Sequence, residues 1–367
     1  MTETPEVLLA ILTDLGTDHR CFKLAKSLRQ SGFKPVIYCD KPAHLPGPAW
    51  DDFEIHVLTS ESHQRRFFPV FMSFLRRLTP VLWNSPAKVW ISLDAPPLFW
   101  LAFWGKLRGR TVVYDSHELF LETPLVLNRP SRRMFWWLWE RGGFAFISKA
   151  ITVSPAIVAR LQKRNTGVDF YLLPNMPFLT PPNLMKRPPL SEGVRLVFQG
   201  GLRVATGLPE LFVAMMLHPG FSLDVYGAGT EDSKLREAAH REGVEKKTVF
   251  HGAVPFEMLP DILAQAHIGI HLMQPICDSF ALTWANKIFD YVHALTPVLL
   301  SDNPAHRELL REFRVGVVVD SFSPEAIARG LEELLADYET FVEECCKARE
   351  HWHWDAYATG LRGFLEA

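Results

Sequence analysis

The chain has 367 residues, 48% of them hydrophobic, which suffices for two domains that each bury a core. This composition excludes a disordered protein, a collagen and a disulfide-stapled scaffold. With 39 basic and 41 acidic side chains, the net charge of −2 gives no overall attraction to nucleic acid. No nucleic-acid-binding motif is present either, so nucleic acid is not an expected partner.

Targeting features are also absent from the sequence. The five cysteines include no CxxC pair, which is typical of reduced thiols in a cytosolic protein. The polar N-terminus does not resemble a signal peptide. No uninterrupted apolar run reaches the roughly 18 residues that a membrane span needs. We therefore expect a cytoplasmic protein.

The first half of the chain alternates strand and helix patterns. The apolar run 6–14 predicts a buried parallel strand, and the pattern over 18–30 predicts a helix that Gly32 ends. Further strands are predicted at 34–39, 89–94, 111–116, 150–153 and 170–173. Alternation of this kind indicates a doubly wound parallel sheet.

A proline-rich connector at 174–193 separates this series from a second one. The second series has predicted strands at 194–198, 222–226, 248–250, 268–272, 297–300 and 315–319. Its predicted helices are 208–217, 234–242, 256–265 and 285–295. The fold class is therefore α/β, with two Rossmann-like domains, 1–178 and 190–350, facing a central ligand-binding cleft. An amphipathic C-terminal helix, 352–367, is expected to pack back on the first domain.

Two predicted strand ends in the first domain carry candidate site residues. Gly16 follows the first strand and allows close backbone approach before a helix N-terminus, where Asp18 is expected to act as the cap. The segment is not GxGxxG, so it is not a dinucleotide fingerprint. At the end of the strand 111–116, Asp115 is expected to cap the next helix, whereas His117 and Glu118 are expected to be functional.

Glycines follow the strands of the second domain. Gly200 and Gly201 expose backbone N–H groups that can bind an anion, and Arg203 matches phosphate geometry. Gly227 and Gly229 follow the next strand and can let a ligand come close. His251 and Gly252 end a third strand at the same edge of the sheet. Together these segments predict a ligand site at one edge of the sheet. A surface arginine after a tight turn is the alternative for Arg203, but the adjacent glycines favour phosphate binding.

The helix pattern near 285–295 carries the last cluster. Asn286, Lys287 and Asp290 lie three and four residues apart and share a face near the helix start. Lys287 could meet an anion there, and Asp290 could accept hydrogen bonds from a ribose diol. A solvated face with a Lys287–Asp290 ion pair is the alternative, and periodicity alone favours it.

Taken in order, these residues resemble glycosyltransferase family 4, which has the GT-B fold, over most of the chain. The resemblance rests on YDSHEL from Tyr114, on VSP at 153–155, on LPN at 173–175 and on GAGTEDSKL from Gly227. Its strongest element is NKIFDY at 286–291 followed by Pro297.

The resemblance implies roles for particular residues. Arg203 and Lys287 would hold a donor diphosphate, and Asp290 would bind ribose. The base pocket would be lined by the segments Gly227–Glu231 and His251–Gly252. His117 and Glu118 would face the transferred sugar and the acceptor. The implied catalytic residues are His117, Glu118, Arg203 and Lys287. The implied donor-binding residues are Gly16, Gly201, Arg203, Gly227, Gly229, Glu231, His251, Asn286, Lys287 and Asp290.

Two positions depart from the family pattern. Leu282 stands where the family often has the first of two glutamates, and Thr206-Gly207 stands in place of Lys-Gly. The implied reaction is sugar transfer from a nucleotide-diphosphate donor, with retention, to a glycan or lipid-linked acceptor. No metal and no cofactor are predicted, and the chain's cations would stabilise the departing diphosphate. A nucleotide-sugar epimerase and a non-catalytic nucleotide-sugar-binding or partner protein remain open alternatives.

Two apolar segments flanked by arginines, 65–77 and 132–141, stand out in the first domain. Basic and aromatic amphipathic segments suit an anionic membrane surface. Two core-packing helices with charged ends are an equally good interpretation. The membrane interpretation would place the protein at the inner face of the membrane and would favour a lipid-linked acceptor.

Overall fold

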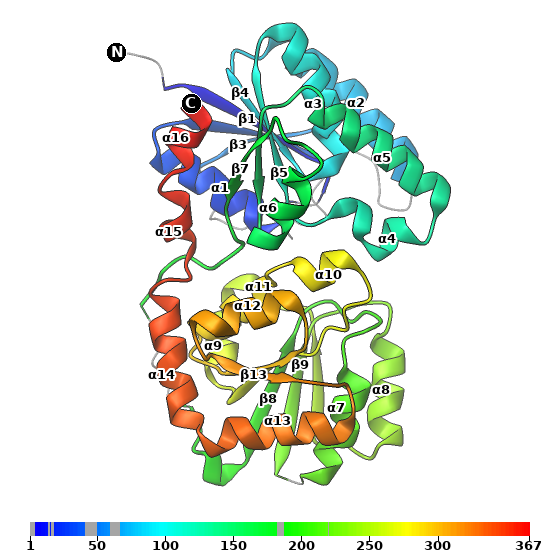
Figure 1. Ribbon diagram of the computed structural model, residues 1–367, viewed down its shortest axis with the longest axis vertical. Coiled ribbons are helices and arrows are strands. Elements are labelled where there is room, and N and C mark those ends of the chain that lie inside the picture. Colours follow the sequence, from blue (N-terminus) through cyan, green and yellow to red (C-terminus); the bar gives the residue numbers. More distant parts are fainter. Residues whose placement is uncertain are drawn as a thin grey trace. The chain divides into compact units, whose positions relative to one another are not determined.

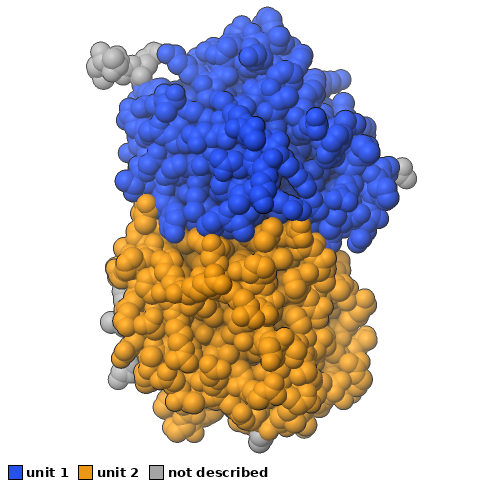
Figure 2. All heavy atoms as spheres, in the orientation of Figure 1, with its two compact units in different colours: residues 1–174, 357–367 blue, residues 175–356 orange. Residues whose placement is uncertain are grey.

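A computed structural model describes the chain except residues 1–3, 14, 16–17, 41–49, 59–66, 182–186 and 219 and the side chain at 125. The chain divides into two compact units, coloured separately in Figure 2. Unit 1 comprises Met1–Pro174 and Tyr357–Ala367, and unit 2 comprises Asn175–Ala356. The predicted boundaries at 178 and 190 bracket a connector whose described part belongs to unit 2.

Unit 1 is built on a seven-stranded parallel sheet in the order β3-β2-β1-β4-β5-β6-β7. The strands are β1 (Glu6–Ile11), β2 (Lys34–Cys39), β3 (Glu54–Val57), β4 (Val89–Leu93), β5 (Thr111–Ser116), β6 (Lys149–Thr152) and β7 (Asp169–Leu172). The central strands are buried almost throughout, as the apolar runs predicted. The carboxyl ends of β1, β4 and β5 therefore meet at one edge.

Helices cover this sheet (Figure 1). They are α1 (His19–Gln30), α2 (Phe67–Asn84), α3 (Ala95–Arg108), α4 (Pro124–Leu127), α5 (Pro130–Phe144) and α6 (Pro155–Gln162), with a 3₁₀ turn η3 (Phe120–Glu122). The carboxylate of Asp18 accepts a hydrogen bond from Cys21 N at 2.8 Å, which confirms its predicted capping role. Strand order reverses between β1 and β4, so right-handed crossovers put α1 on the face opposite α3.

Unit 2 has a six-stranded parallel sheet in the order β10-β9-β8-β11-β12-β13. The strands are β8 (Val194–Gln199), β9 (Phe221–Tyr226), β10 (Thr248–Gly252), β11 (Ile268–His271), β12 (Val298–Ser301) and β13 (Gly316–Val319). Two parallel sheets, each with helices around it, give the predicted fold class.

The helices of unit 2 are α7 (Leu208–Leu217), α8 (Asp232–Arg241), α9 (Leu259–Ala264), α10 (Asp278–Leu282), α11 (Asn286–His293), α12 (Pro304–Glu312), α13 (Pro324–Ala336) and α14 (Tyr338–Arg349). Two 3₁₀ turns are η4 (Leu190–Glu192) and η5 (Phe256–Met258). One core cluster joins the sheet to α7, α8 and α13. Helix α11 buries Ile288, Phe289, Tyr291 and Val292.

The C-terminal segment differs from the single helix predicted over 352–367. It forms two short helices, α15 (Trp354–Ala358) and α16 (Leu361–Glu366). Trp352 is fully buried in unit 2 against Phe289. In unit 1, Lys149 Nζ donates to Phe364 O at 2.7 Å. The segment that was predicted as one helix therefore packs against unit 2 at its start and against unit 1 at its end.

Among the described residues, no helix is both long enough and apolar enough to cross a bilayer.

Candidate functional site

In unit 2 the loops after β8, β9 and β10 are joined by backbone hydrogen bonds. Gly200 N donates to Tyr226 O at 2.9 Å, and Gly227 N donates to Gly252 O at 2.7 Å. Farther along, Leu202 N donates to Ala228 O at 3.0 Å. The three segments that the sequence singled out therefore lie side by side at the carboxyl edge of the sheet.

The glycines after β9 have a structural role in the packing of the neighbouring loop. Gly227 has φ +146°, and a Cβ there would lie 1.8 Å from Gly200 O. A Cβ at Gly229 would lie 2.1 Å from Leu202 O. These glycines admit the neighbouring loop, because any side chain would collide with its backbone. The observed close approach is thus between two loops of the chain.

Lys287 and Arg203 lie over consecutive glycines. A Cβ at Gly200, which has φ +134°, would lie 2.0 Å from Lys287 Cε. A Cβ at Gly201 would lie 2.9 Å from Arg203 Nε. The structure therefore brings together the two cations that the sequence predicted to act on one anion.

The two cations also interact electrostatically. Burial lowers the pKa of Lys287, Asp290 raises it and the charge of Arg203 lowers it further. Among the described residues, neither Arg203 nor Lys287 forms an ion pair with an acidic side chain. The alternative prediction of a Lys287–Asp290 ion pair is therefore wrong. The N–H of Gly200 donates to Tyr226 O, so the prediction that it is free to bind an anion was wrong. Two adjacent cations without an ion-pair partner among the described residues favour a bound polyanion.

Helix α11, which carries Lys287, is fixed to the sheet by Tyr291. The Tyr291 hydroxyl accepts from Gln199 N at 2.9 Å and lies 3.3 Å from both Val197 O and Ile270 O. Burial raises the pKa of Tyr291, so the hydroxyl stays protonated and can donate to these carbonyls. Gly269 provides the room, because a Cβ there would lie 2.5 Å from the Tyr291 ring. Gln199 Nε2 also donates to Asp290 Oδ2 at 3.0 Å.

The remaining donor-side candidates are spread around this edge. His251 Nε2 lies 2.6 Å from Asp224 Oδ1, and its ring stacks on Tyr226 at 4.3 Å. Glu231 precedes α8 and accepts hydrogen bonds from Lys234 Nζ at 3.0 and 3.1 Å. Asn286 is exposed at the first position of α11. The predicted Gly16 lies outside the described residues.

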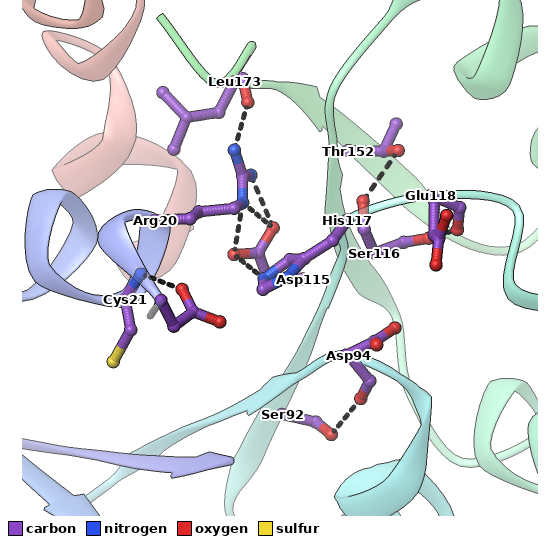
Figure 3. Close-up of polar contacts among 11 residues, drawn as sticks. Arg20, Cys21, Ser92, Asp94, Asp115, Ser116, His117, Glu118, Thr152 and Leu173 are labelled. Atoms are coloured by element: carbon purple, nitrogen blue, oxygen red, sulfur yellow. Dashed lines mark hydrogen bonds and ion pairs between the residues drawn. The ribbon is translucent and has the colours of Figure 1, made fainter. Parts of the chain in front are cut away.

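A second polar cluster lies in unit 1 at the end of β5 (Figure 3). Asp115 is fully buried and does not cap a helix, so that prediction was wrong. Its carboxylate accepts from Arg20 Nε at 3.0 Å and from Arg20 Nη2 at 2.6 Å. Arg20 Nη1 donates to Leu173 O at 2.8 Å. A buried carboxylate needs a charged partner, and Arg20, 95 positions earlier in the chain, is the partner of Asp115.

His117 is held by this ion pair. His117 Nε2 lies 3.4 Å from Asp115 Oδ2, and 21% of the side chain is exposed. Burial lowers the pKa of His117, but the ionic contact with the Asp115 carboxylate outweighs burial and raises it to about 9. Burial raises the pKa of Asp115, but Arg20 and His117 bring it down to about 2. His117 is therefore an imidazolium at neutral pH, which suits it to donate hydrogen bonds.

Asp94 and Glu118 flank this imidazolium. Asp94 has φ +64°, and its Oδ1 is buried without a hydrogen-bond partner. The charge of His117 lowers the pKa of Asp94, although burial, the larger cause, raises it. The backbone carbonyl of Glu118 accepts from Ser116 Oγ at 2.9 Å.

Four of these residues escaped the sequence analysis as site residues: Arg20, Asp94, Gln199 and Tyr291. Asp94 and Gln199 had a usable signal, since each is polar and directly ends a buried apolar strand. Arg20 and Tyr291 had none, because each lies within an ordinary helix pattern.

In the part of the chain that the structure describes, no three His, Cys, Asp or Glu side chains are grouped closely enough to hold a metal ion.

Two family models match the chain in sequence. Residues 16–172 match the glycosyl transferase 4-like domain, and residues 190–352 match the model of glycosyl transferases group 1. A curated relative is the GDP-mannose-dependent alpha-(1-6)-phosphatidylinositol monomannoside mannosyltransferase of Mycobacterium tuberculosis. It is 28% identical over 151 residues, which are 40% of this chain and 39% of the relative. The chain thus spans about two fifths of that protein's length.

Solved structures share the fold. Sucrose-phosphate synthase from Thermosynechococcus elongatus aligns with a TM-score of 0.76 at 13% identity, over 99% of this chain and 98% of that one. HepE from Anabaena, solved in complex with UDP, aligns with a TM-score of 0.76 at 14% identity over 99% of both chains. With both family models and the fold in agreement, the chain belongs to the family 4-like glycosyltransferases of the GT-B fold.

Proposed function

We propose that the chain transfers a sugar from a nucleotide-diphosphate donor to a glycan or lipid-linked acceptor, with retention of anomeric configuration. The observation that carries this proposal is the pair of cations, Arg203 and Lys287, over Gly200 and Gly201 at the carboxyl edge of unit 2. The named relatives act with GDP-mannose or were solved with UDP, which supports a nucleotide-sugar donor.

The chemistry follows from these charges. As the bond between the sugar and the diphosphate breaks, negative charge grows on the departing oxygen. Arg203 and Lys287 are fixed cations that interact more strongly with that charge than with the intact donor, so they lower the barrier. Asp290, held by Gln199, would bind the ribose. His117 and Glu118 of unit 1 would contact the acceptor and the transferred sugar, and the imidazolium of His117 would donate to an oxygen there.

The test measures donor binding and turnover with UDP-, GDP- and ADP-sugars. Each charge-assisted hydrogen bond contributes roughly 1.5–3 kcal/mol, so Arg203→Ala and Lys287→Ala should each weaken binding of the preferred donor about 10- to 100-fold. Lys347→Ala, which removes an exposed cation from α14, is the control and should bind donor normally. Wild-type affinity in Lys287→Ala would remove this lysine from the site.

Product analysis separates the alternatives. A glycoside product with the anomeric configuration of the donor supports retaining transfer, whereas inversion refutes retention. A new nucleotide-sugar epimer would indicate an epimerase. Tight donor binding without turnover over a broad acceptor panel would indicate a non-catalytic member, for which Leu282 in the usual glutamate position is the structural reason.

We also propose that α2, α3 and α5 rest on an anionic membrane surface. Ring contacts join α2 to α5 and α5 to α3, and α3 contacts α2 (Figure 1). Exposed apolar side chains on these helices are Phe67, Phe68, Met72, Trp83, Phe103, Leu107, Met134, Trp137 and Leu138. The helices also carry seven basic side chains: Arg76, Arg77, Lys106, Arg108, Arg132, Arg133 and Arg141.

Charge complementarity supports lipid rather than protein as the partner. The single acid in the three helices, Glu140, is buried, so these helices expose only positive charge. Arg133 is paired with Glu122 of η3. Exposed aromatic and aliphatic groups beside cations match the headgroup region of an anionic bilayer. The alternative of two core-packing helices accounts for Phe71 and Trp136, which are buried, but not for the exposed set. Residues 65 and 66 of the predicted segment lie outside the described residues.

Vesicle sedimentation tests this surface. The protein should bind vesicles of phosphatidylcholine with phosphatidylglycerol and should bind pure phosphatidylcholine much less. The double variant Trp137→Ser, Leu138→Ser should lose binding. Met216→Ser, Leu217→Ser removes equally exposed apolar side chains from unit 2 and should bind as the wild type does. Equal binding by both double variants would contradict the assignment.

A further inference from the structure

His271 is a buried histidine at the carboxyl end of β11. The residue is 4% exposed. Strand β11 pairs with β8 on one side, where Ile270 is opposite Phe198, and with β12 on the other, where His271 is opposite Leu300. His271 therefore lies at the same sheet edge as the glycines that follow β8.

The imidazole of His271 lacks a protein partner. It forms no hydrogen bond with any residue in the described ranges of the chain, and neither of its nitrogens is sealed from solvent. The neighbouring His306 provides a contrast, with ring centroids 5.1 Å apart. His306 Nδ1 lies 2.7 Å from Ser301 O, and Nε2 lies 3.2 Å from Asn303 Nδ2. A buried polar ring without a partner needs one, and His271 lies at the sheet edge where Lys287 acts on it.

Charges around His271 keep it neutral in the free protein. Burial lowers its pKa well below the usual value, and the neighbouring His306 and the positive charge of Lys287 lower it further. Burial also lowers the pKa of His306 to about 4, so His306 is neutral near pH 7. Lys287 faces it from α11 and His306 from α12. Asp290 on α11 and Arg203 act on Lys287, and Gln199, on the adjoining strand β8, carries no charge. An anion at Lys287 would offset the nearest fixed positive charge.

We propose that His271 is an additional ligand of the donor diphosphate, which gains a proton from solvent when the donor binds and donates a hydrogen bond to a phosphate oxygen beside Lys287. This inference rests on the proposed function, since it assumes that the anion at this edge is a donor diphosphate. It makes donor binding proton-coupled. By linkage, uptake of one proton raises donor affinity up to about tenfold for each unit by which the pH falls.

Calorimetry of donor binding tests the coupling without any variant. UDP-glucose and GDP-mannose are suitable probes because their diphosphate diesters do not titrate near neutral pH, so any proton taken up binds to the protein. Titrations in phosphate and in Tris buffers, whose ionisation enthalpies differ, give the number of protons bound. We expect the wild type to take up a proton with the donor that binds, and an uptake of zero overturns the proposal.

Variants assign the proton to His271. His271→Asn should abolish the uptake and weaken donor binding roughly tenfold, the loss of about one hydrogen bond to a charged group. His271→Gln is a second variant in case the first is poorly folded. His240→Asn, at an exposed histidine of α8, should leave both quantities unchanged. Wild-type uptake in a folded His271 variant overturns the proposal.

The same titrations distinguish this inference from the proposed function. If Lys287→Ala weakens donor binding and His271→Asn does not, only the role of His271 is wrong. If the wild type binds no nucleotide-sugar, both proposals are wrong.

Discussion

At Gly200 the absence of a side chain makes room for the side chain of Lys287. The backbone there has φ +134°, and a Cβ would lie 2.0 Å from Lys287 Cε. Residues with a side chain rarely adopt such a φ, and the lysine stem occupies the only place where a Cβ could go. The glycine thus sets both the loop conformation and the position of the ammonium group.

Gly200→Ala should therefore damage function more than stability alone explains. We expect donor binding to weaken at least tenfold because Lys287 must move, together with a loss of roughly 1–3 kcal/mol in the free energy of unfolding. Gly243→Ala is the matched control, because Gly243 has φ +70° and nothing within 4 Å of its added Cβ. It should cost about 1 kcal/mol and leave donor affinity intact. Calorimetry and urea unfolding measure the two quantities, and equal donor affinity in both variants would contradict the argument.

Glu140 gives unit 1 a pH-dependent stability. This carboxyl on α5 is buried, and Tyr114 donates to its Oε1 at 3.3 Å. Burial raises the pKa of Glu140 from 4.5 to about 7. Because the folded protein holds this proton more tightly than the unfolded chain, the stabilisation is complete below about pH 4.5 and is lost as the pH rises to about 7.

Glu140→Gln removes this titration and keeps an oxygen that can accept from Tyr114. Near pH 8 the variant should be more stable than the wild type by up to about 3 kcal/mol, while near pH 4.5 the two should be similar. Urea unfolding over a pH series measures the difference. Glu366→Gln, at an exposed acid, should not change the pH profile. The raised pKa of His117 causes a separate loss between about pH 6.5 and 9, which should persist in Glu140→Gln.

The sequence predicted residue roles unevenly. Asp18 was identified as a cap because capping depends on its own backbone segment. Asp115 was misread as a cap because its partner, Arg20, comes from another helix 95 positions away. His271 had the same kind of signal as Asp94 and Gln199, since it is polar and ends a buried apolar strand. Its surroundings could not be predicted, because they are formed by α11 and α12, which follow it in the chain.

At the scale of elements, α11 and β8 are joined by hydrogen bonds. The hydroxyl of Tyr291 accepts from Gln199 N and also contacts carbonyl oxygens of β8 and β11. The first turn of the helix carries Lys287. The position of Lys287 therefore depends on the hydrogen bonds that hold α11 against β8. Sequence periodicity predicted the helix and the strand, but it did not predict these hydrogen bonds.

Tyr291→Phe should loosen this connection. It leaves the N–H of Gln199 buried without an acceptor, which costs about 1–3 kcal/mol of unfolding free energy. Because α11 can then shift, donor binding should weaken several-fold. The control is Tyr338→Phe, which also removes a bonded hydroxyl in unit 2, one that bonds Arg187 and His267 O. A similar loss of stability with unchanged donor affinity is expected for the control, and identical behaviour of the two variants would refute the coupling.

At the scale of the whole molecule, the chain returns to unit 1 after completing unit 2. Residues from Tyr357 onward belong to unit 1, where Lys149 Nζ donates to Phe364 O and Arg362 Nη1 donates to Ser31 O at 2.8 Å. Leu361 and Leu365 are buried there. The sequence indicated two domains and a segment that returns to the first. It did not predict that the return occurs at Tyr357, because that depends on which unit buries each aromatic side chain of the segment.

Truncation after Ala356 should therefore destabilise unit 1 and spare the donor site of unit 2. Losing two buried leucines should lower the stability of unit 1 by about 3–6 kcal/mol. Eight of the eleven tryptophans lie in unit 1, so tryptophan fluorescence mainly reports its unfolding. Donor affinity, measured by calorimetry below the lowered transition, should match the full chain because Arg203, Lys287 and the glycines beneath them all lie in unit 2. An unshifted fluorescence transition would show that the returning segment does not stabilise unit 1. Loss of donor binding by the truncated chain would show that unit 2 alone does not determine affinity.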